Sequence, residues 1–282
     1  MWKEVVRIRL DEVNKIIEDF EEKIKNPVKN PKGELYTGVD LGTAFIVLTV
    51  YDKDKNPIAG AYQYAEVVRD GMVVDYMGAC DIVRKLKEEI EDKIGRDLVL
   101  AGVAVPPGTE AIDGGVVKNV CEACGFEVVA SFDEVSAANK LLKIDSGVVV
   151  DMGGGTTGVS ILENGKTIKT NDEPTGGRHL SLVLAGAYKT TLDQAENLKR
   201  DFSKHKEIFP AISPVLDKVS SIIDETIDGD QVDKVVLVGG SALLSGIEDY
   251  IGNRLNLPTL KPINPMFVTP IGICFGLIES SL

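Results

Sequence analysis

Two short loops in the sequence repeat residue types that can bind a phosphate group. The segment VDLGT places Asp40, Gly42 and Thr43 at the end of one β-branched run, and the segment VDMGGGT, which begins at Val150, ends a second run in the same way. Glycine lets backbone N–H groups approach an anion closely, and threonine hydroxyls add further donors. An aspartate here repels a phosphate, but it can hold a hydrated Mg²⁺ that bridges several phosphates. One copy alone would be an ordinary hairpin turn, whereas the repeat predicts two loops that clamp a polyphosphate.

Two other phosphate motifs fit the sequence less well. Gly153, Gly155 and Gly158 spell G-x-G-x-x-G after a strand, but a dinucleotide site needs this loop to open a helix. The continuation VSILENGKTIKT instead predicts strand, turn and strand, although Asp172 lies near the spacing of a ribose-binding acid. No G-x-x-x-x-G-K-[ST] occurs, which excludes a P-loop.

The elements that carry the two loops also repeat. Residues 35–68 read as strand, turn and strand, and are followed by a helix over 76–94, a strand over 98–106, a helix that closes the run from Glu110 to Cys124, a strand over 126–130 and a helix over 133–142. Residues 147–170 repeat the opening, and helices then lead to a buried strand at VDKVVLVGG, a helix over 243–255 and a last helix after Pro265. This order predicts an α/β fold with two lobes from an internal duplication, the first over 35–145 and the second over 146–282.

Residues 1–30 are predicted to form an N-terminal helix and a linker ahead of these lobes. Apolar residues recur at helical spacing over 3–25, with charged residues between them, and Pro27, Pro31 and Gly33 punctuate the polar segment 26–34. The apolar stripe can dock on the protein itself, which is the commoner fate, or enter a groove on a partner.

Composition narrows the class of protein. The chain has 282 residues, a formal net charge of −13 and 27% charged residues. This acidity argues against nucleic acid or an anionic membrane surface as the main partner. No apolar run is long enough to span a bilayer and no signal peptide is evident, so we expect a cytoplasmic protein. Cys121 and Cys124 form a C-x-x-C without further zinc ligands, so we interpret them as small buried residues.

Taken together, the motifs resemble the actin-like ATPase superfamily. The two loops are similar to its phosphate loops, and Val238-Gly239-Gly240-Ser241 is similar to its adenosine loop. The run from Asp133 to Ala138 resembles the connecting helix of DnaK-type chaperones, and the run from Glu196 to Ser203 resembles the spacing with which they hold adenosine. Thr175 to His179 also resembles the bacterial cell-shape and division actins. The resemblance covers residues 35–282 and implies two ribonuclease-H-like lobes with a nucleotide between them.

The resemblance also implies roles for individual residues. It assigns catalysis to Asp40, Glu134, Asp151 and Thr156, with Glu134 positioning the attacking water and the two aspartates holding Mg²⁺ through water. It assigns ATP binding to Gly42, Thr43, Ala44, Gly153, Gly154, Gly155, Thr157, Gly176, Gly177, Glu196, Lys199, Arg200, Ser203, Gly239, Gly240 and Ser241. By themselves, Glu196 and Lys199 would be an ordinary ion pair one helical turn apart, and Glu134 a surface or capping residue.

The sequence departs from the chaperone pattern at several positions. Leu243 stands where an adenine-stacking arginine is usual, and Met266 stands where the Asn-Pro motif normally carries an acid. The catalytic lysine of the first lobe has no matching motif, with Lys53, Lys55 and Arg69 as candidates. We therefore expect ATP binding with slow hydrolysis at most.

At this length the chain resembles a compact DnaK-like family of the ethanolamine utilization pathway, whose enzymes lie in protein-shelled microcompartments. This implies a slow Mg²⁺-dependent ATPase that serves as a chaperone-like, reactivating or assembly factor, with pathway enzymes or shell proteins as partners. Two alternatives stay open: a nucleotide-binding scaffold without significant hydrolysis, and a small-molecule kinase of the sugar-kinase branch.

Overall fold

The protein consists of two compact units. The computed structural model describes residues 2–69, 72–105 and 113–281. One unit combines Met1–Lys143 with Pro262–Leu282, and the other is Ile144–Lys261. None of the helices described over these ranges is long and apolar enough to cross a membrane. Each unit contains a five-stranded sheet, and the two sheets are described in turn.

The sheet of the first unit has the order β3-β2-β1-β6-β7. Its strands are β1 (Leu35–Leu41), β2 (Phe45–Asp52), β3 (Pro57–Tyr64), β6 (Leu100–Val105) and β7 (Glu127–Asp133). A small hairpin, β4 (Val68–Arg69) and β5 (Met72–Val73), precedes α2 (Tyr76–Ile94), and α3 (Asp113–Ala123) lies between β6 and β7 in the chain. The first three strands, β1, β2 and β3, are antiparallel, whereas β6 and β7 run parallel to β1. The beginning of the predicted helix at Glu110 falls outside the described residues.

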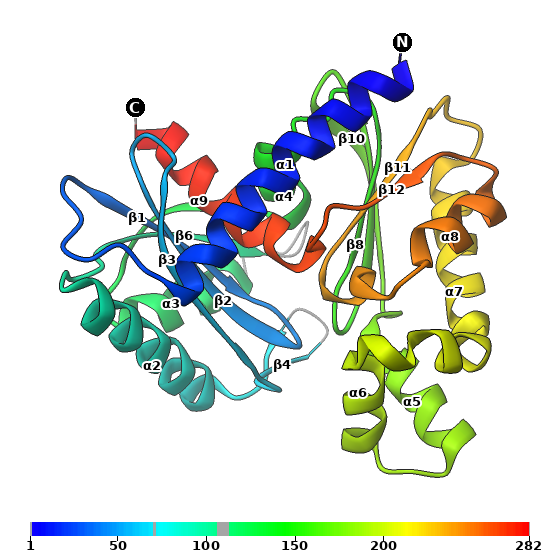
Figure 1. Cartoon of the computed structure of the whole chain (residues 1–282), viewed down its shortest axis with the longest axis horizontal. Helices are drawn as coiled ribbons and strands as arrows, with labels where there is room; N and C mark the ends of the chain where they lie inside the picture. The colour runs from blue at the N-terminus through cyan, green and yellow to red at the C-terminus, as the bar shows by residue number, and fades with distance from the viewer. Residues whose placement is uncertain (1, 70–71, 106–112, 282) are drawn as a thin grey trace. The chain divides into compact units, whose positions relative to one another are not determined.

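The sheet of the second unit has the equivalent order β10-β9-β8-β11-β12. Its strands are β8 (Gly147–Met152), β9 (Thr157–Glu163), β10 (Lys166–Glu173), β11 (Val235–Val238) and β12 (Thr259–Leu260). The first three are again antiparallel and the last two parallel. The helices of this unit are α5 (Gly177–Tyr188), α6 (Leu192–Arg200), α7 (His205–Ile227) and α8 (Ile247–Leu255), and Figure 1 shows α7 as its longest helix. The predicted duplication of one α/β lobe is therefore confirmed.

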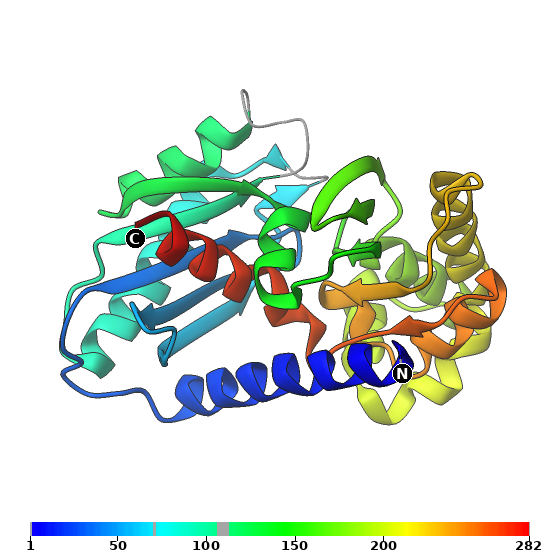
Figure 2. The same ribbon diagram turned by 90° about the horizontal axis from the view of Figure 1, so that it is seen from above.

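The last helix, α9 (Val268–Ser281), belongs to the first unit. The sequence predicts a second lobe that runs continuously from 146 to 282, whereas the second unit of the structure ends at Lys261. The helix runs beside α4 (Glu134–Leu142), and Gly272 lies so close to α4 that an added Cβ would stand 1.9 Å from the carbonyl oxygen of Ala137 (Figure 2). Thr49 Oγ1 of β2 donates a hydrogen bond of 2.9 Å to the carbonyl of Pro270. The residues from Val268 to Ile278 are all buried, because α4 and the sheet both cover them.

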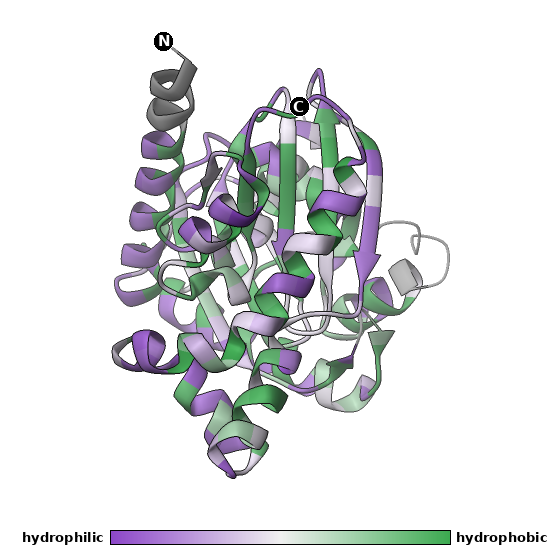
Figure 3. Ribbon diagram, turned by 90° about the vertical axis from the view of Figure 1, so that its right-hand side faces the viewer, coloured by the Kyte–Doolittle hydropathy of each residue, from purple (hydrophilic) through white to green (hydrophobic). Residues whose placement is uncertain are grey.

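The N-terminal helix, α1 (Trp2–Lys25), docks on the first unit over its described side chains. Polar and apolar residues alternate along it (Figure 3), and Val13, Ile17 and Phe20 are buried. The Phe20 ring stacks on Tyr51 of β2, and an added Cβ at Gly60 of β3 would lie 2.4 Å from that ring. Self-docking, the commoner of the two expected fates, is thus what residues 10–25 adopt.

We expect Phe20→Ala to lower the free energy of unfolding by about 3–5 kcal/mol, because a fully buried aromatic side chain is removed from between Tyr51 and Phe267. Urea unfolding followed by circular dichroism measures the loss. Phe202→Ala is the matched control, since 61% of Phe202 is exposed and its removal should cost less than about 1 kcal/mol. Equal stability of the two variants would show that the helix does not stay docked in solution.

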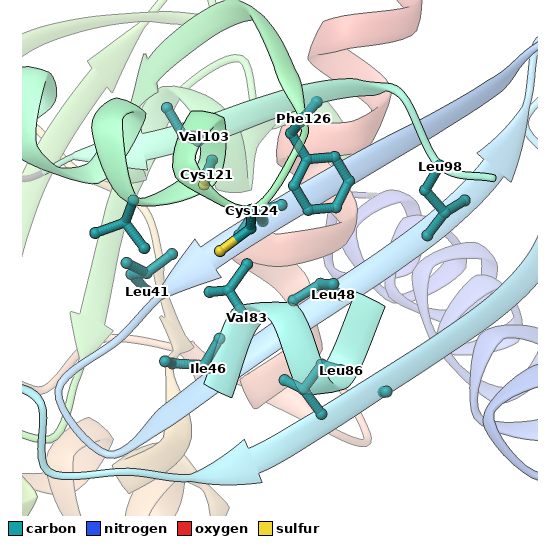
Figure 4. Packing of buried hydrophobic residues seen from close by; sticks show 14 of the residues in the cluster. Leu41, Ile46, Leu48, Val83, Leu86, Leu98, Val103, Cys121, Cys124 and Phe126 are labelled. Carbon is teal, nitrogen blue, oxygen red and sulfur yellow. The ribbon is translucent and has the colours of Figure 1, made fainter. Parts of the chain in front are cut away.

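Cys121 and Cys124 are buried in the apolar core of the first unit. Cys121 and Cys124 pack with Val83, Phe126 and other apolar residues between the sheet and the helices α2 and α3 (Figure 4). Burial raises the pKa of the Cys124 thiol to about 11, so a reactive thiolate is scarce at neutral pH. Within the described ranges no cluster of His, Cys, Asp and Glu could hold a metal ion directly. The thiols therefore behave as small apolar residues.

Candidate functional site

The two predicted phosphate loops share one backbone geometry. In the first, the Gly42 N–H donates a 3.0 Å hydrogen bond to the carbonyl of Phe45, and in the second the Gly153 N–H donates an equally long bond to the carbonyl of Thr156. Asp40 and Asp151 each lie one residue before the end of the first strand of their sheet, and both are half-buried. The sequence repeat is thus a repeat of structure as well.

Both loops offer backbone donors that the protein does not use. Within the described ranges, the N–H groups of Thr43 and Ala44 in the first loop, and of Gly154 and Gly155 in the second, make no hydrogen bond to a protein acceptor. Consecutive unused N–H groups in a glycine-rich turn form a concave anion-binding surface. The aspartate at the preceding strand end suits a hydrated Mg²⁺ rather than the anion itself. The arrangement can therefore hold a phosphate and its counter-cation.

The first unit places Glu134 at the same sheet edge as Asp40. The strands β1, β6 and β7 are parallel, so their carboxyl ends meet at one edge. Asp40 lies near the end of β1, and Glu134 directly follows β7 as the first residue of α4. The side chain of Asp133 caps this helix by accepting the Ser136 N–H at 2.8 Å. Asp133 is thus the N-cap of α4, and the capping role considered for Glu134 has no support.

Lys53 and Lys55 lie far from this edge. They occupy the turn after β2, whereas the phosphate loop precedes β2, and a strand of that length spans about 25 Å. Lys55 Nζ also pairs with Glu279 at 2.8 Å and lies over the Phe275 ring. Neither lysine therefore serves the first loop as a phosphate-binding cation.

In the second unit, the carbonyl of Gly153 joins the phosphate loop to two other predicted motifs. It accepts the N–H of Gly177, at the start of α5, at 2.9 Å, and the hydroxyl of Ser241 at 2.8 Å. The neighbouring Gly154 carbonyl accepts the N–H of Arg178 at 2.8 Å. Thr157 Oγ1 donates to the carbonyl of Thr175, which precedes the two glycines. The phosphate loop, the start of α5 and the adenosine loop therefore form one cluster.

Three glycines in this cluster stand where no side chain fits. An added Cβ at Gly176 would lie 2.5 Å from the backbone of Gly155, and one at Gly177 would lie 2.5 Å from Ser241 Oγ. Gly239 adopts a φ of +88°, and its Cβ would lie 2.3 Å from Asp151 Oδ1. By contrast, an added Cβ at Gly240 would meet nothing within 4 Å, which leaves open space beside the loop.

Glu196 and Lys199 belong to a largely buried polar network rather than to an exposed ion pair. Lys199 Nζ donates three hydrogen bonds, to Glu196 Oε2 at 2.6 Å, to the Gly177 carbonyl at 2.9 Å and to Ser181 Oγ at 3.0 Å. Burial lowers the pKa of Lys199, an effect that the adjacent Glu196 opposes. All three N–H bonds of the ammonium are used within the protein. The predicted contact of Lys199 with ribose would therefore require one of these bonds to break.

Glu196 keeps an acceptor for a ligand. Its Oε2 receives Lys199 and the Ser181 hydroxyl, the latter at 2.6 Å, while Oε1 has no hydrogen-bond partner among the described residues. Arg200 and Ser203 are exposed at the end of α6, and Ser203 Oγ donates to Asp201 Oδ1 at 2.6 Å. The structure thus brings Glu196 and Lys199 to the phosphate loop, and it leaves Arg200 and Ser203 at the surface.

Sequence reasoning missed two members of this network. Ser181 lies on α5 and contacts both Glu196 and Lys199, and the buried His205 contacts the carbonyl of Lys199 at 2.9 Å. Neither residue belongs to a motif. For Ser181, the one available signal was its spacing of four residues from Gly177, which places both on one face of a helix.

Comparison with known proteins places this geometry in a family. The family model of the cell division protein FtsA matches residues 148–272, and the MreB/Mbl protein model matches residues 59–191. The ethanolamine utilization protein EutJ of Escherichia coli (strain K12) is 40% identical over 242 residues, which cover 85% of this chain and 84% of that protein.

Solved structures agree with these matches. The crystal structure of the ethanolamine utilization protein EutJ from Carboxydothermus hydrogenoformans is 43% identical, has a TM-score of 0.89 and covers 94% of this chain and 98% of that one. The MreB5 structure of Spiroplasma citri bound to AMPPNP shares the fold, with a TM-score of 0.69, 17% identity and coverage of 89% of this chain and 100% of that one. The chain therefore belongs to the family of the ethanolamine utilization protein EutJ, whose fold is that of the actin-like ATPases.

Proposed function

We propose that this protein binds Mg²⁺-ATP through its phosphate loops and hydrolyses it slowly. The observation that carries the proposal is the pair of equivalent loops, each with consecutive unused N–H groups beside a half-buried aspartate. The AMPPNP bound to the MreB5 relative supports a nucleotide as the ligand of this fold. The acceptor at Glu196 Oε1, next to the phosphate loop, suits a ribose hydroxyl.

Each group of residues in the proposed site has a separate role in ATP binding or hydrolysis. The N–H groups of the loops would bind phosphate oxygens, and Asp40 and Asp151 would hold a hydrated Mg²⁺. Bound Mg²⁺ supplies positive charge that offsets the charge on the phosphates. Glu134 orients the attacking water, since positioning and electrostatic stabilisation carry most of phosphoryl transfer. The turn lysines are remote from the first loop, and we therefore expect slow turnover.

The names of the EutJ relatives support a role in ethanolamine utilization. A slow ATPase in that setting suits a chaperone-like, reactivating or assembly factor in the cytoplasm, with pathway enzymes or microcompartment shell proteins as its partners. The docking of α1 favours a partner surface elsewhere on the molecule. A scaffold that binds nucleotide without turnover is the second candidate, and the remoteness of Lys53 and Lys55 from the first loop favours it.

Calorimetric titration of ATP, ADP and GTP with and without Mg²⁺, followed by phosphate-release assays, tests the proposal. Binding with slow release in the absence of any other substrate supports the ATPase. Tight binding without release supports the scaffold, and release that depends strictly on a sugar or acid would identify a small-molecule kinase. Absence of binding to all three nucleotides would contradict nucleotide binding itself.

We expect Gly240→Val to weaken ATP binding by about tenfold or more while leaving the melting temperature unchanged. A Cβ at Gly240 meets no protein atom, so a loss of affinity must come from a ligand that approaches the loop closely. Calorimetry and thermal melting measure the two quantities. Gly186→Val on α5 is the control, because its Cβ also points into open space but outside the cluster. Unchanged affinity of the Gly240 variant would remove this loop from the site.

A further inference from the structure

His205, the first residue of α7, bridges two segments of the candidate site. The residue is 3% exposed. Its Nε2 lies 2.9 Å from the carbonyl of Lys199 in the last turn of α6, and its Nδ1 lies 3.0 Å from both the backbone nitrogen and the Oγ of Ser245. Ser245 closely follows the 3₁₀ turn η2 (Gly240–Leu243). One imidazole ring therefore links α6 to the segment that directly follows η2 and the adenosine loop.

The partners fix the protonation state of this ring. A backbone carbonyl can only accept a hydrogen bond and a backbone N–H can only donate one. Nε2 must therefore carry the proton that faces Lys199, and Nδ1 must be the bare acceptor that faces Ser245. A second proton on Nδ1 would point at the Ser245 N–H and break that contact. The hydrogen bond from the Ser245 backbone consequently exists only with a neutral imidazole, and a protonated Nδ1 would have to turn to Ser245 Oγ instead.

Both ends of the bridge lead to the phosphate loop. At one end, Lys199 uses its side chain to hold the Gly177 carbonyl, and the Gly177 N–H holds Gly153. At the other end, η2 carries Ser241, whose hydroxyl holds the same Gly153 carbonyl. The His205 ring therefore connects two sets of contacts that both lead to Gly153, one through α6 and one through η2. The distance between α6 and η2 depends on this ring.

We propose that His205 is a positioning residue that holds α6 and the adenosine loop at the separation required by the nucleoside part of the ligand, and that acid releases this hold. The inference rests on the proposed function and adds to it a pH dependence of nucleotide affinity. His205 itself touches no nucleotide in this scheme. It acts through Lys199 and Ser245.

Burial of the ring favours its neutral form. Burial lowers the pKa of His205 below its ordinary value of 6.5, the Lys261 ammonium adds to this shift, and the Lys199 carbonyl and the Asp201 carboxylate oppose it. Lys261 also donates to the carbonyls of Ala242 and Leu244 and pairs with Glu248 at 2.9 Å, so it stays beside η2. Because the folded-state pKa is depressed, the stabilisation is present above 6.5 and is lost as the pH falls from 6.5 toward the lower folded-state value.

The first test compares ADP affinity at a pH of about 7.5 and of about 5.5 in the wild-type protein and in His205→Gln. Glutamine can keep the donor toward Lys199 but loses the acceptor for Ser245 and does not titrate. We expect the variant to bind ADP about fivefold more weakly at the higher pH. The wild-type affinity should fall about fivefold more between the two pH values than that of the variant. The comparison cancels the titration of ADP itself.

The chain offers a matched control, since its only other histidine is the exposed His179. His179→Gln should keep the wild-type pH dependence. If the pH dependence disappears in His179→Gln and persists in His205→Gln, the proposal is overturned. Failure of wild-type protein to bind ADP at either pH would overturn the proposed function instead.

The second test needs no substitution. If the neutral bridge favours the ADP-binding state, then saturation with ADP must lower the pKa of His205 by the reciprocal amount. A ¹H–¹³C NMR titration of the two histidine rings, with and without ADP, measures this directly. We expect ADP to lower the pKa of His205 by about 0.7 unit or more, the equivalent of the fivefold change in affinity expected in the first test. The same value with and without ADP would overturn the proposal.

Discussion

Replacement of Gly272 by alanine is expected to destabilise the first unit by about 3 kcal/mol, the upper end of the usual cost of overpacking a core. The added Cβ would stand 1.9 Å from the carbonyl oxygen of Ala137 and 2.6 Å from its carbonyl carbon. Both are backbone atoms of α4, so no side-chain rotation relieves the overlap, and α9 must move away from α4. That movement would also pull Pro270 from Thr49 and loosen the contact with β2.

Urea unfolding of Gly272→Ala measures this loss. Gly186→Ala is the matched control, because the same methyl group is added to a helix where nothing lies within 4 Å. In the control, alanine's higher helix propensity should leave stability unchanged or raise it by up to about 1 kcal/mol. A stable Gly272→Ala variant would show that α4 and α9 are less tightly packed than the structure has them.

Asp151→Asn is expected to weaken the Mg²⁺-dependent part of ATP binding by about 10- to 100-fold, as replacement of groups that orient a metal's ligands typically does. Asparagine keeps the size of the side chain but removes the negative charge that holds metal-bound water. Since the expected turnover depends on Mg²⁺, phosphate release should fall to the level measured without Mg²⁺.

Calorimetric titration with and without Mg²⁺ separates the two components of binding. Asp228→Asn provides the same change of net charge at an exposed residue after α7, where asparagine also tolerates the φ of 38°. This control should bind Mg²⁺-ATP like the wild-type protein. Wild-type phosphate release by Asp151→Asn would refute the proposed metal site.

The predictable parts of the fold are those determined by residues that lie close together in the sequence. The alternation of β-branched residues and the recurrence of Asp-x-Gly define β1 and β8 with their loops, and the predicted helix over 76–94 coincides with α2. The body was expected to begin near Leu35, and β1 begins there. These features depend on residues within a few positions of one another, so spacing alone reveals them.

The missing parts are contacts between distant segments. Ser181 meets Lys199 across two helices, and His205 meets Ser245 across 40 residues, so no short motif records either contact. The predicted end of the second lobe, at residue 282, differs from the structure for a similar reason. The segment from Val268 to Ile278 is apolar on all sides, which indicates burial but does not say which sheet buries it.

The discontinuity of the first unit has a consequence for synthesis on the ribosome. Residues 144–261 form the second unit from one continuous stretch, so this unit can fold as soon as it emerges. The first unit lacks α9 until the whole second unit has been synthesised, although its sheet and α4 are made first. Nascent chains therefore expose the face of the first sheet that α9 later covers, and a stop codon before Val268 leaves that face bare permanently. Premature termination between Lys261 and Val268 should thus yield an aggregation-prone chain whose second unit is nevertheless native.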